Sequence, residues 1–197
     1  MLDDTVSSRE LGGCIEYMDD GDNLTVDDIR SGRGGERFRM SSSLNPSLGY
    51  SRNPVWVRFR ISNRENHPVS WYLEHSYPIM DRITLYYPDR EEGGEITMGD
   101  VLPFGQRVMP YRNFIFPVTT PPGEHTYYLK LQTRGSIVIP LTMWSPGAFS
   151  KKRETERTVY GLVYGFQGKV MGALKKHPDA ALIDFGAVSK LIQAKLP

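Results

Sequence analysis

The sequence predicts a mainly β protein, and three observations support this fold class. The chain holds 19 Gly, 14 Pro and 11 Tyr among 197 residues, a turn-rich and aromatic mixture that favours many short strands over long helices. Short alternations of apolar and polar residues recur through its middle, separated by Pro, Gly and Asp turns. The length allows one domain core with a short appendage. We therefore expect an antiparallel β-sandwich followed by a helical tail.

The first fifty residues predict little regular structure. Residues 14–22 alternate briefly before an Asp/Gly turn, which indicates an edge strand followed by a loop. Thr25 precedes acidic residues that suit a helix N-terminus, so residues 25–30 are expected to form one short helix capped by Thr25. Residues 31–53 are rich in Gly, Ser, Asn and Arg and are interpreted as a long surface loop, with one strand at 37–40.

The clearest strand covers residues 55–61, where apolar side chains occupy every second position. The sequence predicts five further strands between turns, at 70–76, 82–87, 113–118, 126–132 and 136–144. The last two are expected to pair as a hairpin in which Gly135 supplies a positive φ. Pro140 in the returning strand indicates an edge or a bulge.

The character of the sequence changes near Ser150, where we place the end of the sandwich. A mixed-charge run at 151–157 is followed by helix-leaning sequence. Residues 179–195 carry apolar side chains at helical spacing, which predicts a short amphipathic helix. The sandwich domain is thus expected to cover residues 11–150, and the helical tail residues 151–197.

Charge, cysteine content and apolar runs bound the class of protein. Lys and Arg number 24 against 23 Asp and Glu, so net charge implies no partnership with nucleic acid. The single Cys14, expected to be buried, excludes an internal disulfide framework. The apolar-leaning stretch 159–173 is interrupted by Gln167 and Lys169 and is too short to span a membrane, and residues 1–9 carry no secretory signal. We expect the chain to be soluble.

No motif indicates catalysis or a bound metal. The acidic segment 20–25 matches part of a Ca²⁺ loop, but Thr25 stands where that loop needs Gly, and Ser31 stands where it needs Glu. The histidines lack the spacing of a metal site, and neither Cys14 nor any Ser lies in a nucleophile motif. We therefore expect no cofactor, no metal and no enzymatic activity.

Several short motifs occur in a specific order along the chain. They read Asn-Pro-Val-Trp-Val-Arg-Phe (53–59), Trp-Tyr-Leu-Glu (71–74), Tyr-Pro-Ile-Met-Asp (77–81), Gly-Asp (99–100) with Leu-Pro-Phe (102–104), and Arg107 ahead of Pro-Tyr-Arg-Asn-Phe (110–114). With an opening segment at 24–29 and a closing segment at 144–149, they make residues 11–165 resemble the second type of extracellular sensor domain (7TMR-DISM extracellular 2) of bacterial seven-transmembrane receptors with diverse intracellular signalling modules.

The resemblance implies a jelly-roll sandwich similar to carbohydrate-binding modules. It also implies a periplasmic domain that detects an extracytoplasmic ligand for a membrane-anchored receptor with a kinase or cyclic-dinucleotide output. The family's first membrane helix should begin near residues 160–165 and stay apolar, whereas residues 166–169 turn polar here. Three explanations stay open for residues 166–197: a truncated gene product, a soluble relative, or a foreign tail.

Candidate ligand-binding residues are aromatic side chains beside charged or polar ones, because protein modules stack aromatic rings on sugars and hydrogen-bond the sugar hydroxyls. Arg107 and Arg112 flank Tyr111 in a loop and form the first candidate group. The alternative is a structural one, in which a buried arginine pairs with Asp81 or Asp100 and clamps the loop to the sandwich.

Two strands supply the other candidates. Trp56 and Arg58 lie on the polar side of one predicted strand, and the alternative is that Trp56 packs under a loop. Trp71, His75 and Tyr77 share one side of a second strand, where core packing is the alternative. Aromatic residues occur on both sides of that strand, so alternation does not indicate which face is wet.

These observations together predict a non-enzymatic periplasmic sensor domain with a carbohydrate or carbohydrate-like ligand. The alternative is an interaction module that pairs with itself or with another receptor and takes no small ligand. A glycan-active enzyme is a third possibility, and it needs two carboxylates about 5–10 Å apart in a cleft. A concave groove lined by aromatic residues favours a ligand site, whereas a flat apolar face favours an interaction module.

Overall fold

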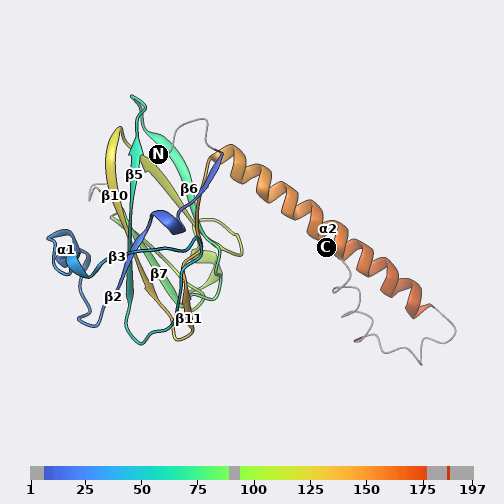
Figure 1. Ribbon diagram of the computed structural model, residues 1–197. Coiled ribbons are helices and arrows are strands. Elements are labelled where there is room, and N and C mark those ends of the chain that lie inside the picture. The colour runs from blue at the N-terminus through green and yellow to red at the C-terminus, as the bar shows by residue number, and fades with distance from the viewer. Residues whose placement is uncertain (1–6, 89–93, 177–185, 187–197) are drawn as a thin grey trace. The chain divides into compact units, whose positions relative to one another are not determined.

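Antiparallel strands form the framework of residues 8–144 in the computed structural model, which describes residues 7–88, 94–176 and 186 (Figure 1). One sheet has the strand order β3-β2-β5-β10-β7-β8, a second has the order β1-β12-β6-β9, and β11 and β4 form a two-stranded ribbon. The strands are β1 Ser8–Glu10, β2 Glu16–Asp19, β3 Arg39–Met40, β4 Ser47–Tyr50, β5 Val55–Asn63, β6 Val69–His75, β7 Arg82–Tyr86, β8 Glu95–Met98, β9 Phe114–Thr120, β10 Gly123–Gln132, β11 Ser136–Val138 and β12 Leu141–Trp144.

One hydrophobic core joins the inner faces of the two larger sheets. Because side chains alternate along a strand, every second residue of β5 from Val55 to Ile61 faces this core. Phe114, Phe116 and Val118 of β9 enter the same core from the other sheet. The prediction of a mainly β, antiparallel sandwich is therefore confirmed, while the jelly-roll arrangement stays a prediction.

The short helix α1 (Val26–Arg30) forms where the sequence predicts it, and it lies outside the sandwich, with its Ile29 in the same hydrophobic cluster as Trp56 of β5 (Figure 1). Thr25 Oγ1 accepts a hydrogen bond from the Asp28 backbone N–H, and the Asp28 carboxylate accepts one from the Thr25 N–H. This reciprocal pair is a capping box, which begins the helix at Val26. Three 3-10 turns lie at Gly12–Cys14, Gly35–Arg37 and Phe104–Gln106.

The predicted hairpin between residues 126–132 and 136–144 is wrong. β10 pairs with β5 on one side and β7 on the other, so it offers no free edge to the chain that follows. That chain instead pairs as β11 with β4, then stops before Pro140 and continues as β12 in the other sheet. Gly135 does not have the positive φ expected of it.

Two other expectations need correction, and three strands were missed. β2 is not an edge strand, because β3 pairs with its outer side. Cys14 is exposed rather than buried, since it lies in a 3-10 turn just ahead of the core residue Ile15. The missed strands are β1, β4 and β8, each of three or four residues and too short to show an alternation.

The helix α2 (Pro146–Lys175) confirms a helical tail as far as residue 175. The chain divides into two compact units, Met1–Ala148 and Phe149–Pro197, so their boundary falls two residues before the one expected near Ser150. The amphipathic helix predicted at 179–195 lies outside the described residues, apart from Gly186. Among the described residues, no helix is long and apolar enough to cross a membrane.

The strand order brings four loops together at one end of the sandwich, which we call the loop end. Because β5, β10 and β7 are antiparallel neighbours, the start of β5, the end of β10 and the start of β7 lie at the same end of the sheet. β6 also ends there, and β9 begins there. The loop end therefore comprises residues 51–54, 76–81, 99–113 and 132–135.

Candidate functional site

Arg107 organises the longest loop of the loop end. One guanidinium nitrogen, Nη1, donates to the backbone oxygens of Tyr111 at 2.8 Å and Arg112 at 2.7 Å. The guanidinium carbon lies 4.9 Å from the ring centre of Phe104 and 4.6 Å from that of Phe114. Arg107 thus holds its own loop together through backbone carbonyls and aromatic rings. The structural alternative offered by the sequence had a different partner, the carboxylate of Asp81 or Asp100.

A buried glutamate anchors the end of the same loop. The Glu74 carboxylate accepts from Asn113 Nδ2 at 2.6 Å and from Trp144 Nε1 at 2.7 Å. Glu74 is almost fully buried, so these charge-assisted bonds compensate for the loss of water around its carboxylate. The loop is therefore held at Asn113 by Glu74 and across its tip by Arg107.

The tip of this loop exposes both apolar and charged side chains. Phe104 is 55% exposed and Val101 and Val108 are also exposed, while Tyr111 is half-buried and Arg112 is exposed. The first candidate group consists of Arg107, Tyr111 and Arg112. The structure thus places Tyr111 and Arg112 at the surface of the loop end, while Arg107 holds their backbone carbonyls. An aromatic and cationic surface of this kind can contact an apolar sugar face and hydroxyl or anionic groups.

His75, the last residue of β6, lies in the core next to this loop. Its ring centre lies 6.2 Å from that of Phe114, the residue on which Arg107 stacks. Nε2 of His75 lies 3.1 Å from the Val138 carbonyl oxygen, and the side chain is fully buried. Burial lowers the pKa of His75 from 6.5 to about 4, so the imidazole is neutral at pH 7. His75 therefore supports the loop end from within the core.

The buried His75 makes the folding stability depend on pH, because between pH 6.5 and pH 4 its imidazole is protonated in the unfolded chain but neutral in the folded chain. The part of the folding stability that depends on neutral His75 is present above pH 6.5 and is lost as the pH falls from 6.5 towards 4. Between pH 7.5 and pH 5 the expected loss from this one group is about 2 kcal/mol. We expect urea unfolding of the His75→Gln variant to lack this component. The exposed His67→Gln serves as the control, and an equal pH dependence in wild type and His75→Gln would contradict the assignment.

The remaining candidates of β6 do not reach the surface of the loop end together. Trp71 is buried in the core, facing Val118 of β9 across the pair. Tyr77 is half-buried and packs against the same core just beyond His75. Ser70, Tyr72 and Glu74 occupy the opposite, outer side of the strand, where Ser70 is exposed, Tyr72 is half-buried and Glu74 is buried. The face that alternation left undetermined is therefore wet only towards the start of β6.

Trp56 lies under a loop, which is the alternative that the sequence offered. Its side chain is 0% exposed and packs with Met18, Leu24, Ile29 and Phe38, so residues 20–38 form a cap over the outer face of the six-stranded sheet. Trp56 Nε1 donates to Asp20 Oδ2 at 3.0 Å, and the Leu24 N–H donates to the same oxygen at 2.8 Å.

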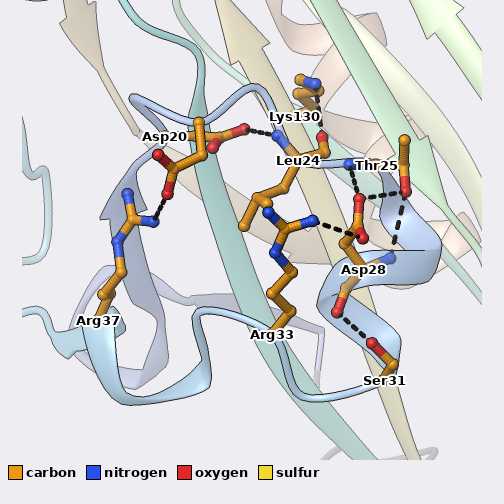
Figure 2. Close-up of polar contacts among 9 residues, drawn as sticks. Asp20, Leu24, Thr25, Asp28, Ser31, Arg33, Arg37 and Lys130 are labelled. Atoms are coloured by element: carbon orange, nitrogen blue, oxygen red, sulfur yellow. Dashed lines mark hydrogen bonds and ion pairs between the residues drawn. The ribbon is translucent and has the colours of Figure 1, made fainter.

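The cap is further held by ion pairs and by one lysine of the sheet (Figure 2). Lys130 Nζ donates to the Leu24 carbonyl oxygen at 3.0 Å and lies 5.0 Å from the centre of the Trp56 ring. Arg37 pairs with Asp22 at 2.6 Å, and Arg33 pairs with Asp28 at 3.1 Å. In this structure the Trp56 ring therefore has no face open to a ligand.

Arg58 is also engaged beneath the cap. It makes two parallel hydrogen bonds to the Glu16 carboxylate, at 2.7 and 2.9 Å, across a register pair of β5 and β2. These bonds lower the pKa of Glu16, chiefly through the hydrogen bond from Arg58. The guanidinium lies 4.3 Å from the ring centre of Phe38, so Arg58 links the cap to the sheet.

A pocket of about 400 Å³ opens beside this surface at the loop end. Three arginines line it together with one carboxylate, Asp81. The full lining is Arg52, Asn53, Pro54, Asp81, Arg82, Val101, Gln132, Thr133 and Arg134. Its volume falls within the range of small-molecule sites, about 300–1,000 Å³. Val101 belongs both to the pocket and to the exposed tip of the 99–113 loop, so the two surfaces are continuous at that residue.

Sequence reasoning missed the pocket because its arginines are far apart along the chain. Arg52 precedes β5, Arg82 begins β7, and Arg134 follows β10. Each one alone is an ordinary turn arginine. The strand order β5-β10-β7 brings the three arginines to the same end of the sheet. The register agrees, since Arg82 lies opposite Gln132, two residues before Arg134.

Fold and loops together define a β-sandwich domain that presents charged and aromatic side chains from one end. The family model described as 7TMR-DISM extracellular 2 matches residues 15–145, and the chain belongs to this family. The family consists of extracellular sensor domains of receptors, so the domain lies on the extracytoplasmic, periplasmic side of the membrane. The resemblance and location expected from the sequence are thus confirmed.

Two further comparisons complete the picture. No curated protein matches the chain. Among solved structures, the chain is similar to the crystal structure of a non-crystalline cellulose specific carbohydrate-binding module, CBM28, with 12% sequence identity. That similarity covers 53% of this chain and 72% of the other, with a TM-score of 0.24. A TM-score of this size does not establish a shared fold.

Proposed function

We propose that this domain is the ligand-binding part of its receptor and that the loop end binds a carbohydrate or a carbohydrate-like ligand. The observation that carries the proposal is the pocket of about 400 Å³, which adjoins a loop with exposed aromatic and cationic side chains. Sugar recognition needs such a combination, because the ring has apolar faces and polar edges.

The preorganisation of the loop supports this proposal. Arg107 and Glu74 hold the 99–113 loop at its tip and at its end, so little conformational entropy is lost when a ligand binds there. Phe104 has one face against the Arg107 guanidinium yet remains more than half exposed. Arg107 also holds the backbone oxygens of Tyr111, which is half-buried, and of Arg112, which is exposed.

A glycan-array screen of the purified chain, followed by calorimetry with the best glycan, tests the proposal. We expect the double variant Phe104→Ala, Arg112→Ala to weaken binding at least tenfold, because each side chain contributes on the scale of about 1 kcal/mol or more. The control is Arg64→Ala, an exposed arginine in the turn between β5 and β6 at the opposite end. Unchanged affinity in a folded double variant, or a screen with no binder, would overturn the proposal.

The second candidate function is an interaction module that pairs with itself or with a receptor partner. Four large apolar side chains exposed in the 76–81 and 99–113 loops favour it, namely Ile79, Val101, Phe104 and Val108. The Asp100 N–H donates to the Met80 carbonyl oxygen at 2.9 Å, so the two loops are joined. A dimer in solution that Phe104→Ala dissociates, together with a silent glycan screen, would favour this function over the first.

A further inference from the structure

We infer that the pocket at the loop end takes a carboxylate-bearing carbohydrate, such as a uronic acid residue, with Arg52 and Arg82 as the groups that bind the carboxylate. This inference rests on the proposed function and specifies its ligand class. The chain as a whole is nearly neutral, with 24 basic against 23 acidic residues, so three arginines around one hollow are a local feature of this site.

Charge in the pocket is unbalanced towards the positive. Asp81 is the one carboxylate of the lining, and it is already hydrogen-bonded to Thr133 and Arg134 in the turn after β10. It accepts from the Arg134 N–H at 3.0 Å, from Arg134 Nε at 3.3 Å and from Thr133 Oγ1 at 3.2 Å. These bonds, led by the one from the Arg134 backbone, lower the pKa of Asp81. Within the described part of the chain, Arg52 and Arg82 make no ion pair and no side-chain hydrogen bond.

The loops that carry these arginines are fastened to the sandwich. Asp19 of β2 accepts from Ser51 Oγ at 2.6 Å and from Asn53 Nδ2 at 2.6 Å, which fixes the backbone on both sides of Arg52. Arg82 is the first residue of β7, opposite Gln132 in β10. Two guanidinium groups are therefore presented from rigid supports, as a ligand site requires.

The rest of the lining suits a sugar ring better than a bare anion. Pro54 and Val101 offer apolar contact, and the half-buried Gln132 side chain makes no hydrogen bond among the described residues and can pair with a hydroxyl. The planar fork of a guanidinium matches a carboxylate with two parallel hydrogen bonds. A pocket of about 400 Å³ has room for a ring in addition to its charged group.

Calorimetric titration of the full chain with two matched probes tests the inference, a trimer of galacturonic acid and the neutral trimer of galactose. We expect the acidic trimer to bind at least tenfold more tightly, and its affinity to fall at least tenfold in both Arg82→Gln and Arg52→Gln. The control Arg64→Gln, which removes an exposed arginine at the other end, should leave its affinity unchanged. Thermal melts verify that each variant is folded.

Each contrary result has its own meaning. If both trimers bind equally and the two pocket variants bind like wild type, the acidic-ligand inference is overturned while carbohydrate sensing stands. If neither trimer binds but citrate or inorganic phosphate does, with loss in Arg82→Gln, the pocket takes a free oxyanion and the sugar part of the inference is overturned. If no glycan, acidic or neutral, binds anywhere on the chain, the proposed function itself fails.

Discussion

Replacing Trp56 by Ala is expected to lower the free energy of unfolding by about 3–5 kcal/mol, the usual loss for a fully buried large aromatic side chain. Trp56 is 0% exposed and fills the space between the six-stranded sheet and the cap of residues 20–38. Its removal leaves a cavity and also takes one of the two hydrogen bonds from the buried Asp20 Oδ2, which keeps only the bond from the Leu24 N–H.

Urea unfolding measures this effect, and hydrogen exchange locates it. Trp56→Phe is the matched variant, because it keeps most of the packing and loses the 3.0 Å bond to Asp20, so a smaller loss of about 1–2 kcal/mol is expected. Exchange of the Leu24 amide, which also bonds to Asp20, should quicken in Trp56→Ala. A loss below about 1 kcal/mol in Trp56→Ala would show that the cap does not depend on the indole.

Replacing Gly99 by Ala is expected to cost about 3 kcal/mol, the upper part of the range for overpacking. A Cβ on Gly99 would lie 1.9 Å from the backbone oxygen of Asp81 and 2.8 Å from its carbonyl carbon. Both are main-chain atoms, so the two loops must separate and the bond from the Asp100 N–H to Met80 is strained or lost. The pocket that depends on Asp81 should be disturbed as well.

The same loop provides the control for this prediction. Gly105 has no heavy atom within 4 Å of an added Cβ and no positive φ, so Gly105→Ala should be nearly neutral. Denaturant midpoints of the two variants, compared with wild type at equal m values, give the difference directly. Equal midpoints for Gly99→Ala and Gly105→Ala would mean that the approach of the 76–81 and 99–113 loops contributes nothing to stability.

Local patterns predicted the parts of the fold that depend on local physics. The alternation in β5 identified Val55 and its partners as core residues because a strand has a period of two. Thr25 identified the start of α1 because a capping box needs only residues close in sequence. The hairpin after β10 failed for the opposite reason, since which strand edge is free depends on the order of strands in the whole sheet.

The candidate site was predictable in part for the same reason. The 107–112 loop is contiguous in sequence, so its arginines and Tyr111 could be named together, and they do lie at one end of the sandwich. Trp56 has the parity of an exposed residue, and only the cap, which comes from residues 20–38, buries it. Arg52 and Arg82 come together through strand register, which no short motif encodes.

The pairing of β1 with β12 determines how the domain responds to a pulling force. Ser8 lies opposite Trp144, and the Ser145 N–H donates to the Ser7 carbonyl oxygen at 2.9 Å, so the chain enters and leaves the sandwich side by side. Tension applied to these two ends acts across the ladder rather than along it, and it opens one hydrogen bond at a time from the end of the pair. β1 would therefore peel away at low force, while the sheets behind it stay intact.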